Sequence, residues 1–406
     1  MSFSFHISIS LFLFFGLIFL VSDSKKLEKF QQVSELDPAE LVIVKTPKTA
    51  AKFGYHPKGF LYEETPNSEV AKKSHKKFVK VMTKEGVKVV KIDKVFRKLS
   101  HEKLEEIAFN FLQYQLAKDS KEVPEKLLYY LSDEHKRDNL RKMSKKQLID
   151  IIFEQPTVII NMTTDLEATH VINRPSANLL FTRDQQIVTA KGLVLGNFGS
   201  RQRTPETELM KIFFQILGIP IIGEVPSPAR LEGGDFIPFS RDLAFLGVGF
   251  YTNMQGANYL MENDLLGSRR LAVVYDEFDM NIQHMHLDTI FNIADESRVV
   301  LLDTVIGNTS KIPRIVREYV QNEDSHKYEL KREVEFSQFL KEEGFQIIPI
   351  TDQQQHGYIT NFLNLGKRHN GKCLIISVHP DLEKILKEAG YEGKVIYVDY
   401  SGITTM

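Results

Sequence analysis

Acidic and imidazole side chains recur in three short strings of this sequence. They are Phe-Thr-Arg-Asp at residues 181–184, Leu-Glu-Gly-Gly-Asp at residues 231–235 and His-Leu-Asp-Thr at residues 286–289. Each string reads as a strand end or a turn. A guanidinium group is planar and stays protonated, and carboxylates pair with its N–H groups in a bidentate manner. The strings therefore suit a flat, cationic substrate such as a guanidinium.

Within this set, the residue types suggest separate roles. Asp184 and Asp288 could grip the two edges of the cation, and His286 could move protons as a general acid and base. Glu232 could orient that imidazole. Taken singly, Asp184 also fits a solvated turn acid, Glu232 a surface acid at a hairpin, and His286 a structural histidine. The chemical interpretation therefore depends on the residues meeting in space.

Composition argues against several other classes of site. The 52 Lys and Arg residues balance 53 Asp and Glu residues, so the basic excess typical of nucleic-acid binding is missing. One cysteine cannot build a disulfide framework or a zinc finger. Gly233-Gly234 lacks the Lys and Ser/Thr of a phosphate loop, and His284-Met285-His286 is sparse for a metal. We expect neither a metal nor a cofactor.

Short apolar runs alternate with helical patterns after Pro156, which predicts an α/β fold. Strands are predicted at residues 41–44, 87–92, 157–161, 193–195, 219–222, 243–248, 271–274, 299–302, 346–348, 373–377 and 394–398. Helices are predicted at residues 68–83, 205–217, 257–266, 313–321, 336–343 and 380–389, and the pattern is helical throughout residues 95–155. Thr204 is the expected N-cap of the helix at 205–217, and Ser144 to Gln147 fit a capping box.

The N-terminus is almost wholly apolar or Ser from residue 7 to residue 21. This run is short for a membrane-spanning helix and suits the core of a signal peptide. We expect residues 1–24 to be a signal peptide that directs the protein to secretion or to the endomembrane lumen. A signal anchor that holds the protein on a membrane, or a wrongly assigned start, are the alternatives. Residues 25–40 are polar and predict a linker.

In this order and at these separations, the three strings resemble arginine deiminase and the wider guanidine-modifying, or amidinotransferase, superfamily. The resemblance implies a pseudo-fivefold α/β propeller over residues 25–406, with residues 95–155 as a helical insertion. It implies that Asp184 and Asp288 bind the guanidinium, and that His286 is the acid/base, supported by Glu232. Asp235, in the same turn as Glu232, joins the predicted substrate-binding residues.

The resemblance also concerns the rest of the substrate. Arg203 lies at the family's usual distance after the first string and would anchor the carboxylate of free arginine, unless it is an ordinary surface arginine. Where a second anchoring Arg would stand, this chain reads Phe250-Tyr251-Thr252, which puts free arginine as the substrate in doubt. The implied partner is a small guanidine such as arginine, with homo-oligomerisation left open.

The nucleophile is the main departure from the family pattern. The family carries a cysteine near its C-terminus, whereas the one cysteine here, Cys373, lies in an apolar strand and reads as a buried small residue. We expect a truncated sequence. The expected activity is hydrolysis of arginine, or a related guanidine, to citrulline (the ureido product) and ammonia through a covalent thiouronium. The alternatives are a catalytically inactive guanidinium-binding protein and an amidinotransferase.

Overall fold

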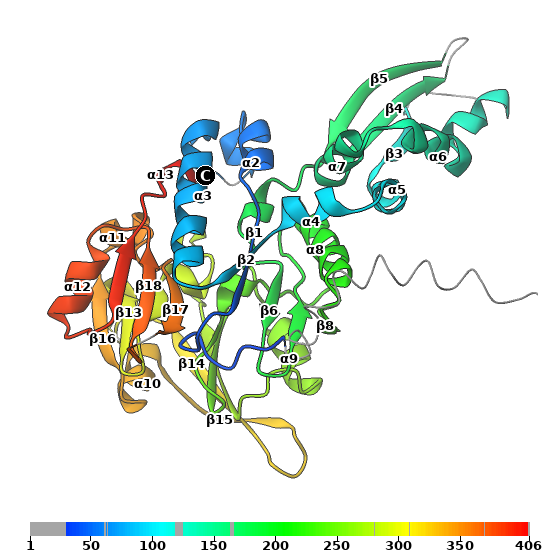
Figure 1. Ribbon diagram of the computed structural model, residues 1–406. Helices are drawn as coiled ribbons and strands as arrows, with labels where there is room; N and C mark the ends of the chain where they lie inside the picture. Colours follow the sequence, from blue (N-terminus) through cyan, green and yellow to red (C-terminus); the bar gives the residue numbers. More distant parts are fainter. Residues whose placement is uncertain are drawn as a thin grey trace, which may run out of the picture.

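The structure is a computed structural model that describes residues 30–60, 62, 64–117, 125–162, 166–279, 281–307, 309–368 and 370–404. The predicted signal segment, residues 1–24, lies outside these residues. Within the described ranges, no helix is long and apolar enough to cross a membrane. Short strands and helices alternate along most of the chain, giving the mixed α/β fold that the sequence predicts (Figure 1).

One structural unit recurs four times from residue 186 onward. An antiparallel strand pair is followed by a helix and by a third strand that runs parallel to the second. The units are β6 Gln186–Val188, β7 Leu193–Leu195, α8 Thr204–Ile216 and β8 Ile221–Glu224; β9 Phe236–Pro238, β10 Leu243–Val248, α9 Met254–Glu262 and β11 Arg270–Tyr275; β12 Phe291–Ile293, β13 Arg298–Leu302, α10 Phe336–Glu342 and β16 Gln346–Ile350; and β17 Leu363–Lys367, β18 Cys373–Ser377, α12 Leu382–Glu388 and β19 Lys394–Tyr397.

A shorter version of this unit precedes the four. In it, β1 Leu41–Val44 and β2 Lys88–Lys91 pair in parallel, and α3 Ser68–Lys84 lies between them in the sequence. The second of the four later units is extended at its edge by β14 Ile315–Gln321 and β15 Tyr328–Glu335, so that its sheet has five strands. The remaining short helices are α2 Lys48–Phe53, α11 Asp352–His356 and α13 Ser401–Thr404.

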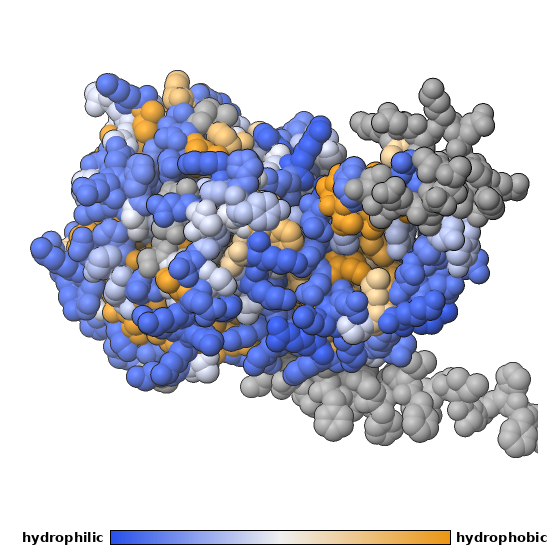
Figure 2. Space-filling view, turned by 90° about the horizontal axis from the view of Figure 1, so that it is seen from above, coloured by the Kyte–Doolittle hydropathy of each residue, from blue (hydrophilic) through white to orange (hydrophobic). Residues whose placement is uncertain are grey.

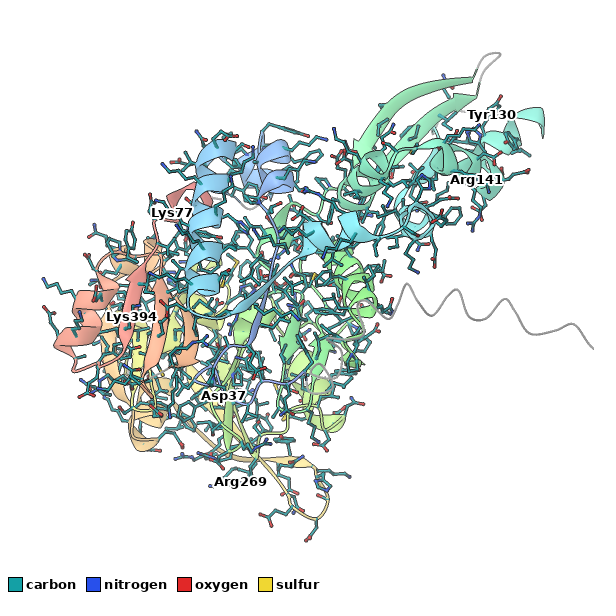
Figure 3. All side chains as sticks on the ribbon, viewed as in Figure 1. Asp37, Lys77, Tyr130, Arg141, Arg269 and Lys394 are labelled. Atoms are coloured by element: carbon teal, nitrogen blue, oxygen red, sulfur yellow. The ribbon has the colours of Figure 1, made fainter. Side chains whose placement is uncertain are left out.

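Residues 92–173 form a lobe at one side of these units (Figure 1). It contains α4 Ile92–Lys98, α5 His101–Phe111, β3 Gln113–Leu116, α6 Asp133–Lys142, α7 Lys145–Glu154, β4 Pro156–Met162 and β5 Leu166–Asn173. Its helices share one apolar core with α8 and β7, which includes Phe96, Leu148, Phe213 and Phe214. Tyr130 and Arg141 mark the lobe in Figure 3.

Most predicted elements are present to within a few residues, and the Ser144–Gln147 capping box is confirmed. The helix predicted at 313–321 is wrong, because these residues form β14, whose β-branched and aromatic residues pair with both β11 and β15. β3 interrupts the predicted helical stretch, since the alternation Gln-Tyr-Gln-Leu has the period of a strand. The N-cap of α8 is Arg203, one residue before the expected Thr204.

The predicted linker is also wrong over its described part, residues 30–40. The backbone N–H of Gln32 donates to the carbonyl of Thr189, and that of Glu35 donates to the carbonyl of Pro238. The Glu35 carboxylate accepts a hydrogen bond from Arg183 at 2.8 Å. Residues 30–40, called the strap below, are therefore bound along the later units although many of them are polar.

Hydrophilic residues cover most of the face of the molecule shown in Figure 2.

Candidate active site

The three sequence strings meet where the loops of neighbouring units approach one another. Asp184 lies just before β6, Glu232 just before a 3₁₀ turn at Gly233–Asp235, and His286 just before another at Leu287–Thr289. The N–H of Gly233 donates to the carbonyl of Asp184 at 3.0 Å, which joins the first two strings. The Leu287 N–H donates to Asp235 Oδ1 at 2.9 Å, which joins the second and third.

The two glycines of the second string allow this close approach. A Cβ on Gly233 would stand 1.9 Å from the carbonyl oxygen of Arg183 and 2.4 Å from that of Gln186. A Cβ on Gly234 would stand 2.7 Å from Nδ1 of His286. The Gly-Gly pair therefore lets the first loop and the histidine ring pack directly on the backbone.

Glu232 and His286 form a buried hydrogen-bonded pair at the centre of the site. His286 Nε2 lies 3.0 Å from Glu232 Oε2, and the two side chains are 7% and 1% exposed. The other carboxylate oxygen, Oε1, accepts a hydrogen bond from the N–H of Gly199 at 3.0 Å. Thr252 Oγ1 accepts a hydrogen bond from the backbone N–H of Glu232 at 3.0 Å. The carboxylate is thus fixed on both oxygens and holds the imidazole in one orientation.

Surrounding acids keep His286 protonated. Burial by itself would lower its pKa, but the hydrogen bond to Glu232 and the charges of Asp235 and Asp184 raise the pKa of His286 from 6.5 to about 10. Burial raises the pKa of Asp235 from 3.8 to about 7 against the opposing effects of His286 and Thr252. An imidazolium held among carboxylates is ready to donate a proton to a leaving group.

We expect the free energy of unfolding to fall as the pH rises from 7 to 9. With a folded-state pKa of about 10, His286 retains a proton that the unfolded chain loses above its ordinary pKa of 6.5. The stability from this proton is complete below pH 6.5 and is lost as the pH rises through the folded-state value. Urea unfolding should show a loss of about 1 kcal/mol per pH unit. The His286→Asn variant should show a flatter profile, and equal slopes would contradict the assignment.

Asp184 and Arg203 form a second buried pair. Arg203 Nη1 donates to Asp184 Oδ2 at 2.7 Å, while its other nitrogens bond Glu206 and the carbonyl of Asn178. Its guanidinium also lies over the ring of Phe198, 4.4 Å from the centroid. Burial opposes the charge, but Glu206 and Asp184 raise the pKa of Arg203 above its ordinary value. Arg203 is therefore not a surface arginine, and its role as a carboxylate anchor stays a prediction.

Asp288 lies at the edge of the site with 15% of its side chain exposed. Its Oδ2 is 3.6 Å from Nε of Arg183, which also bonds Glu35 and the carbonyls of Gly233 and Phe236. Burial raises the pKa of Asp288 to about 6, although Arg183 and His286 act in the opposite direction. Because Arg183 has stronger partners, the Asp288 carboxylate is the acid most available to a ligand.

Tyr251, which stands where the resemblance expects a second anchoring arginine, packs beside the catalytic candidate. Its ring centroid is 5.6 Å from that of His286, at an interplanar angle of 46°. A Cβ on Gly199 would stand 3.0 Å from the Tyr251 ring, so the half-buried ring packs against the backbone of this glycine. The aromatic ring shields the imidazole and supplies no positive charge for a substrate carboxylate.

Cys373 is placed as the sequence suggests for a core residue. It lies on β18, is 3% exposed, and belongs to the same apolar core as Ile375 and Leu382. Burial raises the pKa of its thiol to about 11. A thiol with this pKa is a poor source of thiolate at neutral pH.

Next to the site, a small cavity of about 20 Å³ is lined by His286, His284, Asp276 and Arg314 among others. His284 Nδ1 contacts Asp279, which also accepts a hydrogen bond from Arg314 at 2.8 Å. These groups support the loop that carries His286. Within the described ranges, no group of three or more His, Cys, Asp or Glu residues could hold a metal ion.

The sequence matches a known protein family over most of its length. The family model described as arginine deiminase matches residues 58–406. The chain belongs to the arginine deiminase family. The arginine deiminase of Staphylococcus haemolyticus strain JCSC1435 is 24% identical over 315 residues, covering 72% of this chain and 74% of the relative. That of Staphylococcus aureus strain JH9 is 25% identical over 284 residues, covering 64% of this chain and 65% of the relative. Arginine deiminases hydrolyse amidines, so the family is one of enzymes.

Solved structures of other guanidine-modifying enzymes share the fold. A dimethylarginine dimethylaminohydrolase variant from Pseudomonas aeruginosa, complexed with citrulline, has a TM-score of 0.50 at 13% identity. The match covers 90% of this chain and 94% of that one. An amidinotransferase from Microseira wollei has a TM-score of 0.50 at 14% identity, covering 93% and 94%. At these identities, the likeness concerns the mixed α/β fold alone.

The structure brings five of the six predicted site residues into one connected group: Asp184, Arg203, Glu232, Asp235 and His286. Asp288 adjoins it through Arg183. Asp235 contacts the backbone of the His286 loop, and its predicted contact with substrate stays a prediction. Sequence reasoning missed Arg183, although it stands inside the first string. It also missed Thr252 and Gly199, whose contacts depend on loop geometry that no local pattern encodes.

Proposed function

We propose that this arginine deiminase family member hydrolyses arginine, or a related guanidine, to the ureido product and ammonia. The buried Glu232–His286 pair carries the proposal. His286 is an oriented proton donor, and the carboxylates of Asp184 and Asp288 lie in the first and third strings around it, which is what a flat cation and a departing amine require.

In this proposal, Asp288 and the Asp184 oxygen that is not bonded to Arg203 bind the guanidinium edges. A thiolate adds to the guanidinium carbon, and the C–N bond to one terminal nitrogen breaks as His286 gives that nitrogen a proton, so that ammonia leaves. The neutral imidazole then takes a proton from water, and the hydroxide adds to the thiouronium carbon. The C–S bond breaks last, which returns the thiolate, while the hydroxyl proton of the adduct passes to solvent and the neutral ureido product is released.

We propose that the thiolate comes from a cysteine other than Cys373, the one cysteine of residues 1–406. Replacing Cys373 with serine is expected to leave arginine binding and any turnover within about twofold of the wild type. Its loss removes only a buried thiol from β18. Calorimetry with arginine and a citrulline assay measure both quantities, and a circular-dichroism spectrum controls for folding. Loss of turnover in a folded variant would make Cys373 the nucleophile.

Citrulline and ammonia released from arginine by the full-length gene product test the reaction. Agmatine and a peptide with an internal arginine should be offered in parallel, because Tyr251 occupies the place of a carboxylate anchor. An added primary amine that is converted to a new guanidine would indicate amidinotransfer. No product from any guanidine, with no guanidine binding, would contradict the proposal.

A second function, guanidinium binding without turnover, is favoured by the buried state of Cys373 and its raised thiol pKa of about 11. The acids and the imidazole would then serve recognition alone. Saturable arginine binding in the complete absence of citrulline formation would select this function over hydrolysis.

We further propose that the β1–β2 unit and the four later units close into a pseudo-fivefold propeller, with residues 95–155 as its helical insertion. The recurring strand order supports this arrangement, and a crystal structure tests it. Residues 1–24 are proposed to direct secretion, which sequencing of the mature N-terminus from the secreted fraction would test.

A further inference from the structure

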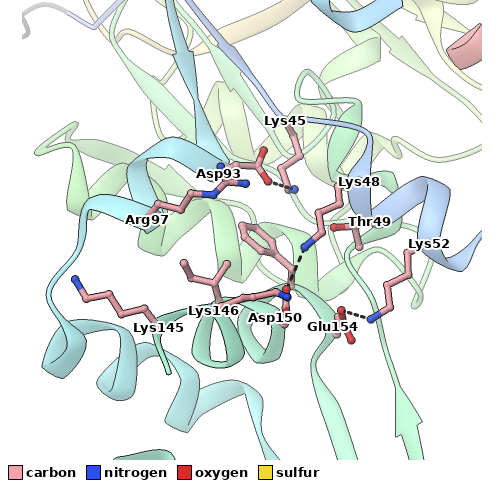
Figure 4. Close-up of a pocket in the computed structure, with 12 residues that line it drawn as sticks. Lys45, Lys48, Thr49, Lys52, Asp93, Arg97, Lys145, Lys146, Asp150 and Glu154 are labelled. Atoms are coloured by element: carbon pink, nitrogen blue, oxygen red, sulfur yellow. Dashed lines mark hydrogen bonds and ion pairs between the residues drawn. The ribbon is translucent and has the colours of Figure 1, made fainter. Parts of the chain in front are cut away.

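A cleft of about 310 Å³ lies where α7 of the lobe faces the first unit and α4 (Figure 4). One wall is α7, and the other consists of the segment from β1 to α2 together with α4. None of its lining residues belongs to the candidate active site. The lining residues are Lys45, Lys48, Thr49, Lys52, Asp93, Arg97, Lys145, Lys146, Ile149, Asp150, Phe153 and Glu154.

The lining carries a marked excess of positive charge. Six basic side chains face three acidic ones, an excess of three charges. The chain as a whole has a formal net charge of −1, so this concentration is local. Cations grouped in a concave site repel one another and raise the local concentration of anions.

At the inner end of the cleft, one ion pair is fully buried. Lys45 Nζ donates to Asp93 Oδ1 at 2.7 Å, and the two side chains are 2% and 8% exposed. Asp93 also accepts hydrogen bonds from the N–H and the hydroxyl of Thr46. Lys45 Nζ lies 4.2 Å from the centre of the Phe153 ring. Asp93 is thus committed to its partners and offers little negative charge to the cleft.

Two exposed ion pairs, Lys48–Asp150 and Lys52–Glu154, cross from α2 to α7. Exposed pairs contribute little to stability, so these lysines can exchange a carboxylate for another anion at small cost. Arg97 and Lys146 have no acidic partner among the described residues, and Lys145 Nζ donates to the carbonyl of Leu99. Three further cations therefore line the cleft without a compensating carboxylate.

We propose that this cleft binds a small phosphate compound that carries two or more negative charges. Its volume lies at the lower end of the range for small-molecule sites. The lining has five lysines and one arginine. A tetrahedral phosphate can contact several ammonium groups from different directions, whereas a planar carboxylate pairs best with the guanidinium of arginine. The lining therefore favours phosphate over carboxylate. The bound anion joins α7 of the lobe to α2 and α4.

Inorganic pyrophosphate is the probe for this site. Because a ligand that binds only the folded protein stabilises it, about 5 mM pyrophosphate should raise the melting temperature by about 3 °C. Sodium chloride at equal ionic strength is the control for general screening. Calorimetry should give a dissociation constant on the order of 0.1 mM, and succinate should bind at least fivefold more weakly. Equal binding of succinate would overturn the assignment to phosphate.

Reversal of two unpaired charges tests the location. The double variant Arg97→Glu, Lys146→Glu should weaken pyrophosphate binding at least tenfold. The matched control Lys327→Glu, Lys331→Glu makes the same change in net charge at exposed positions next to and within β15, away from the lobe (Figure 1). Wild-type binding in the first variant, or equal loss in both, would overturn the proposal.

A variant that binds pyrophosphate more tightly tests the site independently of folding, because a misfolded protein would bind it more weakly. Asp150→Asn removes one of the three acids and releases Lys48, so pyrophosphate should bind about threefold more tightly than to the wild type. Unchanged or weaker binding in this variant, with an unchanged melting temperature in the absence of pyrophosphate, would contradict the site.

Discussion

The Gly233→Ala variant is expected to lose about 4 kcal/mol of its free energy of unfolding, a large fraction of the stability of a typical protein. The new methyl group would stand 1.9 Å from the carbonyl oxygen of Arg183 and 2.4 Å from that of Gln186. Both obstacles are backbone atoms, so no side-chain rotation relieves the overlap. The loops must separate, which breaks the Gly233–Asp184 backbone hydrogen bond.

Gly59→Ala is the matched control for this prediction. Its added methyl group would meet the ring of His56 at 3.4 Å, an ordinary van der Waals distance. Chemical unfolding monitored by circular dichroism should therefore show a change below about 1 kcal/mol for Gly59→Ala. If Gly233→Ala were as stable as the control, the close approach of the first two loops would be wrong.

The Asp288→Ala variant is expected to bind arginine at least a hundredfold more weakly than the wild type, a loss of about 3 kcal/mol. Among the residues that the structure describes, Asp288 has no closer cationic partner than Arg183 at 3.6 Å, and a substrate guanidinium would supply the missing charge. The fold should persist, because Arg183 keeps Glu35 and two carbonyl partners. Isothermal calorimetry with arginine measures the loss.

Asp303→Ala removes an exposed acid from a 3₁₀ turn and is the control. It should bind arginine as the wild type does. Asp288→Asn keeps the shape but not the charge, so it should behave like Asp288→Ala if the carboxylate binds a cation. Unchanged arginine affinity in both Asp288 variants would remove Asp288 from the binding site.

The acids and the histidine of the candidate site could be predicted from the sequence, because each of the three strings is a short run of consecutive residues. Asp184, Glu232 and His286 each lie next to a turn, as the strings indicate, whereas the close backbone approach at Gly233 and Gly234 was not predicted. The partners of these residues could not be read. Arg203 bonds Asp184 across 19 positions and Glu35 bonds Arg183 across 148. Contacts at such separations follow from how the units pack, which local patterns do not specify.

For the fold too, local patterns in the sequence predicted some features, and contacts between distant residues determined others. The alternation of short strands and helices was enough to predict the α/β class, and the capping box at Ser144 located a helix start. The error at 313–321 arose because Pro313 resembles a helix start and Arg317-Glu318 resembles a helical surface. In the structure, Glu318 is fully buried and pairs with Arg270 and Arg332 from adjacent strands. These ion pairs with neighbouring strands favour the extended conformation of β14, and the sequence near Glu318 does not indicate them.

The strap at residues 30–40 has a consequence for the charge of the candidate site. Glu35 holds Arg183 beside Asp288, so a segment 148 residues earlier in the chain helps to shape this edge of the site. Loss of the Glu35 carboxylate would free the Arg183 guanidinium to pair with Asp288 and neutralise that acid. The negative charge that Asp288 offers to a cation thus depends on a segment outside the three loops of the candidate site.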